Sequence, residues 1–79
     1  MARYTDATES WQNVTLTKDE VWYCHSGLLI LDTNSSPGAN DGVPRYPGQS
    51  IGPLPTGMTV YYRAGNDMDT IYERIEVSQ

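Results

Sequence analysis

The stretch TNSSPGANDGVPRYPGQSIGPLPTG, residues 33–57, decides the fold of this chain. It holds all five prolines and five of the seven glycines of the 79-residue sequence. Proline fixes φ and lacks the N–H that a helix interior or a central strand requires, so this stretch cannot form either one. The sequence therefore predicts turns and short edge segments here, with regular structure on both sides.

The chain is short enough to form a single small domain. A chain of 79 residues buries only about 60–65% of the surface that its unfolded form exposes, so we expect an isolated monomer to be marginally stable. Small domains gain stability from disulfides, from a metal or from neighbouring chains. Cys24 is the only cysteine and His25 the only histidine, which excludes an intrachain disulfide and a zinc site with two soft ligands. We therefore expect no metal and no cofactor, and we expect a homo-oligomer or a larger assembly.

The charge and hydropathy patterns argue against nucleic acid and membranes as partners. Five Lys and Arg residues against ten Asp and Glu residues give a net charge of −5. The basic residues are scattered and form no stripe for binding phosphates. The longest apolar run, Leu28–Leu31, is far shorter than the roughly 20 residues of a membrane span. The first ten residues lack the hydrophobic segment of a signal peptide, so we expect a soluble protein made in the cytoplasm.

Short runs rich in β-branched and aromatic residues flank the Pro/Gly-rich stretch. Two of them alternate between apolar and polar residues, as half-buried strands do. Leu28–Asp32 is a short apolar run bounded by Gly27, which is typical of a strand covered on both faces. The spacing predicts an all-β domain, a small antiparallel β-sandwich or barrel of about six short strands. The expected strands are Trp11–Thr17, Glu20–His25, Leu28–Asp32, Gln49–Gly52, Met58–Arg63 and Thr70–Val77.

The last of these segments also fits a helix. Met68, Ile71, Tyr72 and Ile75 have the spacing of one helical face. However, the Thr, Ile, Tyr and Val residues of this segment favour a strand, so we expect a strand with Ile71, Ile75 and Val77 on its inner face. Over the whole chain, the alternation predicts that the following residues are mostly buried: Val14, Leu16, Val21, Leu29, Leu31, Val60, Ile71 and Ile75.

Residues 1–10 (MARYTDATES) are polar and aperiodic, with Tyr4 as their only apolar anchor. Two interpretations are open: a frayed terminus, or an extended arm that becomes ordered on a neighbouring subunit. We divide the chain into an N-terminal arm, residues 1–10, and a single β domain, residues 11–79.

No group of residues has the pattern of an active site. Cys24 and His25 are adjacent on an expected strand and point to opposite faces, so they cannot act together. Asp32–Ser36 begins like a calcium loop, but Pro37 stands where the loop needs glycine and Val43 where it needs glutamate. We therefore expect no enzymatic activity. The acidic residues near the C-terminus are expected to be solvated surface charges: Asp67, Asp69, Glu73 and Glu76.

From Lys18 to Gly65 the order of features resembles a group of small structural proteins of tailed bacteriophages. The chain is similar to capsid decoration (cement) proteins and to head- or tail-fibre proteins with compact β folds. The pieces that carry the resemblance are Val21-Trp22-Tyr23-Cys24-His25 with Gly27, Leu29-Ile30-Leu31, Ser36-Pro37-Gly38 with Gly42, Pro47-Gly48-Gln49-Ser50, and Leu54-Pro55-Thr56-Gly57 leading into Thr59-Val60-Tyr61-Tyr62-Arg63-Ala64.

The resemblance implies a structural virion protein without catalysis or cofactor, made in the host cytoplasm and placed on the capsid surface. Its implied partners are the major capsid protein, whose subunits it bridges, and further copies of itself, as a trimer at threefold positions. Within this hypothesis the expected contact residues are Arg3, Tyr4, Trp11, Arg45, Tyr46 and Pro47.

Two other functions stay open beside this one. A receptor- or carbohydrate-binding head spike or tail-fibre module would need its outward aromatic residues to form one exposed platform. A small enzyme-like barrel would need a pocket with convergent polar groups, which the sequence does not supply.

Overall fold

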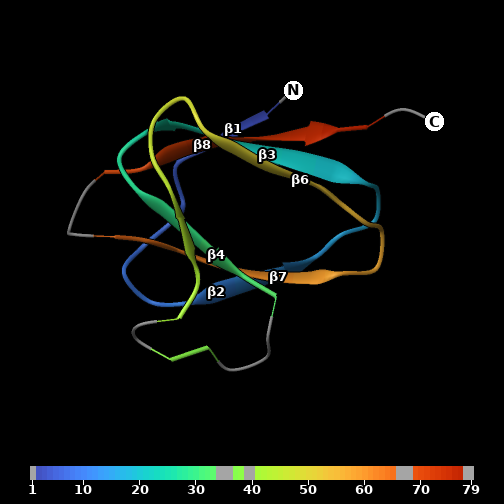
Figure 1. Cartoon of the computed structure of the whole chain (residues 1–79), viewed down its shortest axis with the longest axis horizontal. Helices are drawn as coiled ribbons and strands as arrows, with labels where there is room; N and C mark the ends of the chain where they lie inside the picture. The colour runs from blue at the N-terminus through green and yellow to red at the C-terminus, as the bar shows by residue number, and fades with distance from the viewer. Residues whose placement is uncertain (1, 34–36, 39–40, 66–68, 78–79) are drawn as a thin grey trace.

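The computed structural model of the chain is a sandwich of two four-stranded antiparallel sheets (Figure 1). It describes residues 2–33, 37–38, 41–65 and 69–77, and contains no helix in these ranges. The first sheet has the strand order β1-β8-β3-β6 and the second the order β2-β7-β4-β5. The strands are β1 (Ala2–Tyr4), β2 (Gln12–Thr15), β3 (Glu20–Ser26), β4 (Leu29–Asp32), β5 (Val43–Arg45), β6 (Ser50–Leu54), β7 (Thr59–Ala64) and β8 (Ile71–Glu76). The predicted all-β class is confirmed.

The sequence pattern predicts six of these strands with slightly different bounds. It does not predict β1 and β5, since each has only three residues and alternation is not visible over so short a length. Residues 2–4 of the expected arm thus pair with β8 of their own chain; an arm that reaches a neighbouring subunit stays a prediction. The alternative helix near the C-terminus is replaced by β8, while Met68 lies outside the described residues.

Three aromatic rings from both sheets form the centre of the core. Trp22 of β3 stacks on Tyr72 of β8 at 5.3 Å between ring centroids, and its ring meets Tyr62 of β7 edge-on at 5.4 Å. Aromatic rings at these separations add to the free energy gained from burial alone. The rest of the buried cluster is Leu16, Cys24, Leu29, Leu31, Leu54 and Val60. Four residues expected in the core are therefore buried: Leu16, Leu29, Leu31 and Val60.

The prediction that Ile71 and Ile75 lie on the inner face of the last strand is wrong. Tyr72 faces the core, so Ile71 and Ile75 lie on the outer face, where they are half-buried. Val21, the cross-strand partner of Ile75, is likewise outward and half-buried. Both faces of β3 carry apolar residues, whereas on β8 the alternation favours the face of Ile71 and Ile75. The larger rings of Trp22 and Tyr72 take the inner face because they bury more apolar surface.

Candidate interaction surface

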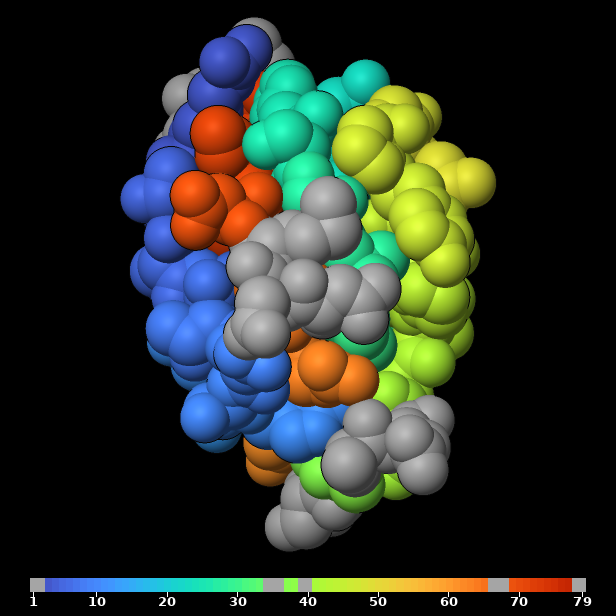
Figure 2. All heavy atoms as spheres, turned by 90° about the vertical axis from the view of Figure 1, so that its left-hand side faces the viewer, coloured from blue at the N-terminus to red at the C-terminus, as the bar shows by residue number. Residues whose placement is uncertain are grey.

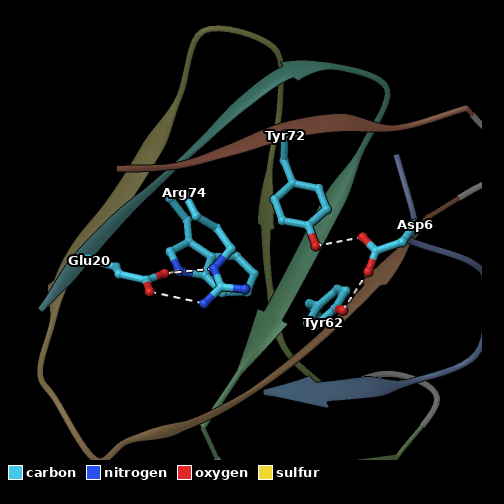
Figure 3. Close-up of polar contacts among 6 residues, drawn as sticks. Asp6, Glu20, Tyr62, Tyr72 and Arg74 are labelled. Atoms are coloured by element: carbon cyan, nitrogen blue, oxygen red, sulfur yellow. Dashed lines mark hydrogen bonds and ion pairs between the residues drawn. The ribbon is translucent and has the colours of Figure 1, made fainter. Parts of the chain in front are cut away.

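An ion pair lies at the edge of the aromatic core. Glu20 accepts hydrogen bonds from Arg74 Nε at 2.7 Å and Nη2 at 2.9 Å (Figure 3). Trp22 Nε1 donates to the same carboxylate at 3.1 Å. The bond to Glu20 raises the pKa of the Arg74 guanidinium, which also lies 5.2 Å from the ring centroids of Tyr4 and Trp22. Glu20 and Arg74 bind each other and the neighbouring rings, so these two charged groups stabilise the fold.

Asp6 joins the two core tyrosines from outside. Its two carboxylate oxygens accept hydrogen bonds from Tyr72 Oη at 2.7 Å and Tyr62 Oη at 3.0 Å (Figure 3). Burial raises the pKa of both phenols, and the hydrogen bonds to Asp6 raise it further. Both tyrosines therefore remain neutral donors at physiological pH.

Cys24 and His25 point to opposite faces, as predicted. Cys24 is fully buried, and burial raises the pKa of its thiol. His25 lies on the outer face of β3, with Nε2 2.7 Å from Glu73 Oε1. The expectation of a solvated Glu73 is wrong, because this side chain is buried on the outer face of β8 beside its cross-strand partner Tyr23. The sequence does not indicate the contact between His25 and Glu73, because 48 residues separate them.

The other expected acidic surface residues divide as follows. Asp69 and Glu76 are exposed, and Asp67 lies outside the described residues. Within the described ranges, no cluster of three or more His, Cys, Asp or Glu side chains has the arrangement of a metal site. In the same part of the chain, no helix has the length and apolar character that crossing a bilayer requires.

The turn between β5 and β6 holds an aromatic side chain in solvent. Gln49 closes the turn twice: its N–H donates to Tyr46 O at 3.0 Å, and its Oε1 accepts from Tyr46 N at 3.0 Å. Gly48 has φ +89, a backbone conformation that residues with a side chain rarely adopt. Gly48 N donates to Cys24 O, and Cys24 N donates to Gln49 O, which ties the turn to β3. The ring of Tyr46, 55% exposed, is thus presented by a fixed backbone.

An apolar groove of about 150 Å³ lies between β5 and β6, where the two sheets part. Val43 at its edge is 45% exposed, which together with Tyr46 makes two large apolar side chains in solvent on the segment that passes from β5 in the second sheet to β6 in the first. The groove is lined by Leu31, Asp32, Thr33, Val43, Ile51, Leu54 and Val60. We call the groove, Val43 and residues 45–47 the β5–β6 surface.

The expected contact residues fall on two opposite flanks of the molecule. Arg45, Tyr46 and Pro47 belong to the β5–β6 surface, whereas Arg3 and Tyr4 belong to β1 at the far edge of the first sheet. Figure 2 shows the two flanks, with the N-terminal residues in blue on one side and the segment from β5 to β6 in yellow-green on the other. Arg3 is exposed, while Tyr4 stacks on the core residue Tyr72 at 5.3 Å.

Trp11 is anchored within the chain. Its Nε1 donates to Gly38 O at 3.1 Å, and the Arg63 guanidinium lies 5.3 Å from its ring centroid. Gly42, just before β5, leaves the space that the ring occupies, since a side chain there would collide with it. Trp11 therefore contacts two described residues ahead of β5, Gly38 and Gly42, and the second of them directly precedes Val43 of the β5–β6 surface.

The outward aromatic residues do not share one face. Tyr23 is on the outer face of the first sheet, Tyr61 is on the outer face of the second, and Tyr46 is on the β5–β6 turn. These three rings form no single platform of the kind that a carbohydrate-binding surface would use.

No known protein family, no curated protein and no solved structure matches this chain. The geometry of the described residues is therefore the basis for assigning a function.

Proposed function

We propose that this protein is a structural virion component that decorates a phage capsid and stabilises it by bridging major capsid subunits. The observation that carries this proposal is the β5–β6 surface: Tyr46 stands exposed on a turn fixed by hydrogen bonds, beside an apolar groove. A rigid aromatic anchor next to a pocket loses little conformational entropy on binding, and such anchors dominate the affinity of protein interfaces.

A role without catalysis agrees with the state of the polar side chains. Glu20, Arg74 and Asp6 are engaged in bonds that stabilise the fold, and Cys24 is enclosed in the core. The groove between β5 and β6 is predominantly apolar and has no converging set of polar groups. Binding is thus the activity that the described surface supports best.

Stabilisation of a shell follows from repetition of a modest contact. A protein that binds only the assembled state shifts the equilibrium toward that state by mass action. If each copy touches two capsid subunits, its second contact forms at a high effective concentration, which multiplies affinity without new chemistry. The net charge of −5 suits a basic capsid surface.

The test is binding of Tyr46→Ala to shells that lack the protein. A central aromatic anchor is worth about 2 kcal/mol or more, so affinity should fall roughly thirtyfold, with loss of the protection against heat-induced DNA release. Tyr61→Ala, the same change on the outer face of the second sheet, is the matched control and should keep wild-type occupancy. Equal occupancy for the two variants contradicts the proposal. If Tyr46→Ala keeps its occupancy and instead abolishes attachment to cells, the receptor-binding alternative is correct.

A further inference from the structure

The outer face of the first sheet carries apolar side chains where a sheet facing water ordinarily carries polar ones. Val21 and Ile75 are cross-strand partners on this face, with Tyr23 and Ile71 beside them, and all four are half-buried. On β2 of the second sheet, by contrast, the outward and exposed residues are polar, namely Asn13 and Thr15. A partner that covers the first sheet would remove this apolar row from water.

Glu73 gives the same face a buried acceptor that lacks a donor. Its Oε1 is paired with His25 Nε2, whereas its Oε2 is buried and has no hydrogen-bond partner among the described residues. Leaving a buried carboxylate oxygen unpaired costs free energy, which a donor from a partner recovers. The terminal torsion of a glutamate is broad, so a small rotation presents Oε2 to a group that arrives from outside.

Arg3 supplies the complementary charge. It lies directly across from Glu73 in the β1–β8 register, is exposed, and forms no ion pair with a described residue. A guanidinium N–H forms a strong, charge-assisted hydrogen bond with a carboxylate oxygen such as Oε2 of Glu73. The face thus contains a cation, the Arg3 guanidinium, and an anion, the Glu73 carboxylate, that can pair with each other.

We propose that this face is a self-association surface, where a second copy of the chain packs so that Arg3 of each copy binds Glu73 of the other. A two-fold axis produces this arrangement, since a surface that carries donor and acceptor forms each contact twice. The row of Val21 and Ile75 then packs against the same row of the second copy. The occupant is a second copy because one surface provides both partners of the pair.

The test is sedimentation equilibrium of free protein, with Arg3→Glu and Glu73→Arg studied separately and mixed. The wild type should sediment as a dimer. Each variant alone places like charges opposite each other, so dimer affinity should fall at least about tenfold. In an equimolar mixture every Arg or Glu at position 3 meets the opposite charge at position 73 of the other chain, so a heterodimer should form with near wild-type affinity. If Arg3 and Glu73 paired only within one chain, mixing the two variants would not restore dimer formation.

The matched controls are Lys18→Glu and Glu76→Arg, which make the same charge changes at exposed positions outside the face. Both should dimerise like the wild type. If Glu73→Arg fails to fold, Val21→Lys provides the second variant, because Val21 is half-buried and makes no side-chain hydrogen bond; it should also weaken the dimer at least about tenfold.

A monomeric wild type, a trimer, or a mixture that stays dissociated overturns the inference. The measurement needs no shell, so its outcome is independent of capsid binding through the β5–β6 surface.

Discussion

Asp6 is an exposed residue whose side chain organises the core. It lies in a polar segment that the sequence leaves open between a frayed terminus and an arm, yet it accepts hydrogen bonds from Tyr62 and Tyr72. Its partners lie 56 and 66 residues away, so no local pattern reveals the contact. Glu73 is a second case, since an acidic residue in an alternating strand is expected in solvent. Residues bonded across long sequence distances are the part of this site that sequence could not predict.

At this scale we predict that stability falls in alkali. Burial raises the pKa of Tyr72 above its ordinary value near 10, so the folded state keeps the proton while the unfolded state loses it. The stabilisation is complete below about pH 10 and is lost as pH rises beyond it, with a slope of up to about 1.4 kcal/mol per pH unit. Urea unfolding at pH 7 to 11 measures this slope.

Tyr72→Phe should remove the contribution of Tyr72 to that slope and cost about 1 kcal/mol at pH 7, through loss of the bond to Asp6. Tyr61→Phe, the same change at a half-buried outward position, is the control for the loss of the Asp6 bond and should cost less than about 0.5 kcal/mol at pH 7. An unaltered slope in Tyr72→Phe would contradict the burial of this phenol.

Among the elements, the sequence predicts best where aliphatic residues occupy one face alone. On β7 the alternation places Val60 inward, as observed, and Pro47-Gly48 marks the turn that the hydrogen bonds of Gln49 close. On β8 the pattern favours the face of Ile71 and Ile75, whereas the ring of Tyr72 takes the inner face. Strand β1 is too short to leave a pattern, although it completes one edge of the first sheet.

For β1 we predict a stabilising role within the single chain. Tyr4→Ala removes a ring that stacks on Tyr72 and lies under the Arg74 guanidinium, and should lower the free energy of unfolding by about 2 kcal/mol. Thr5→Ala, at the next and exposed position, should change it by less than about 0.5 kcal/mol. Urea denaturation compares the two variants. Equal stabilities would mean that the segment is frayed in solution.

Across the whole molecule, the two sheets enclose one thiol that reports on unfolding. Cys24 has no exposed surface. Its backbone N–H and C=O form hydrogen bonds with Gln49 and Gly48, which hold the β5–β6 turn against β3. A thiol reagent reaches such a group only when the sandwich opens.

We therefore predict that the labelling rate of Cys24 follows global unfolding. The opening free energy from labelling should equal the unfolding free energy from urea, within about 1 kcal/mol. In Cys24→Ala with Lys18→Cys, an exposed thiol should react at once in native buffer. Fast reaction of Cys24 in the wild type would show local opening of β3 and would contradict a single cooperative unit.

The bonds between the β5–β6 turn and β3 also determine how the domain responds to mechanical force. A pull applied at Tyr46 loads the Gly48–Cys24 and Cys24–Gln49 hydrogen bonds together, and β3 is paired on its other side with β8. The same turn continues covalently into β5, which is paired with β4 of the second sheet. We therefore expect tension at this contact to be divided between both layers of the sandwich.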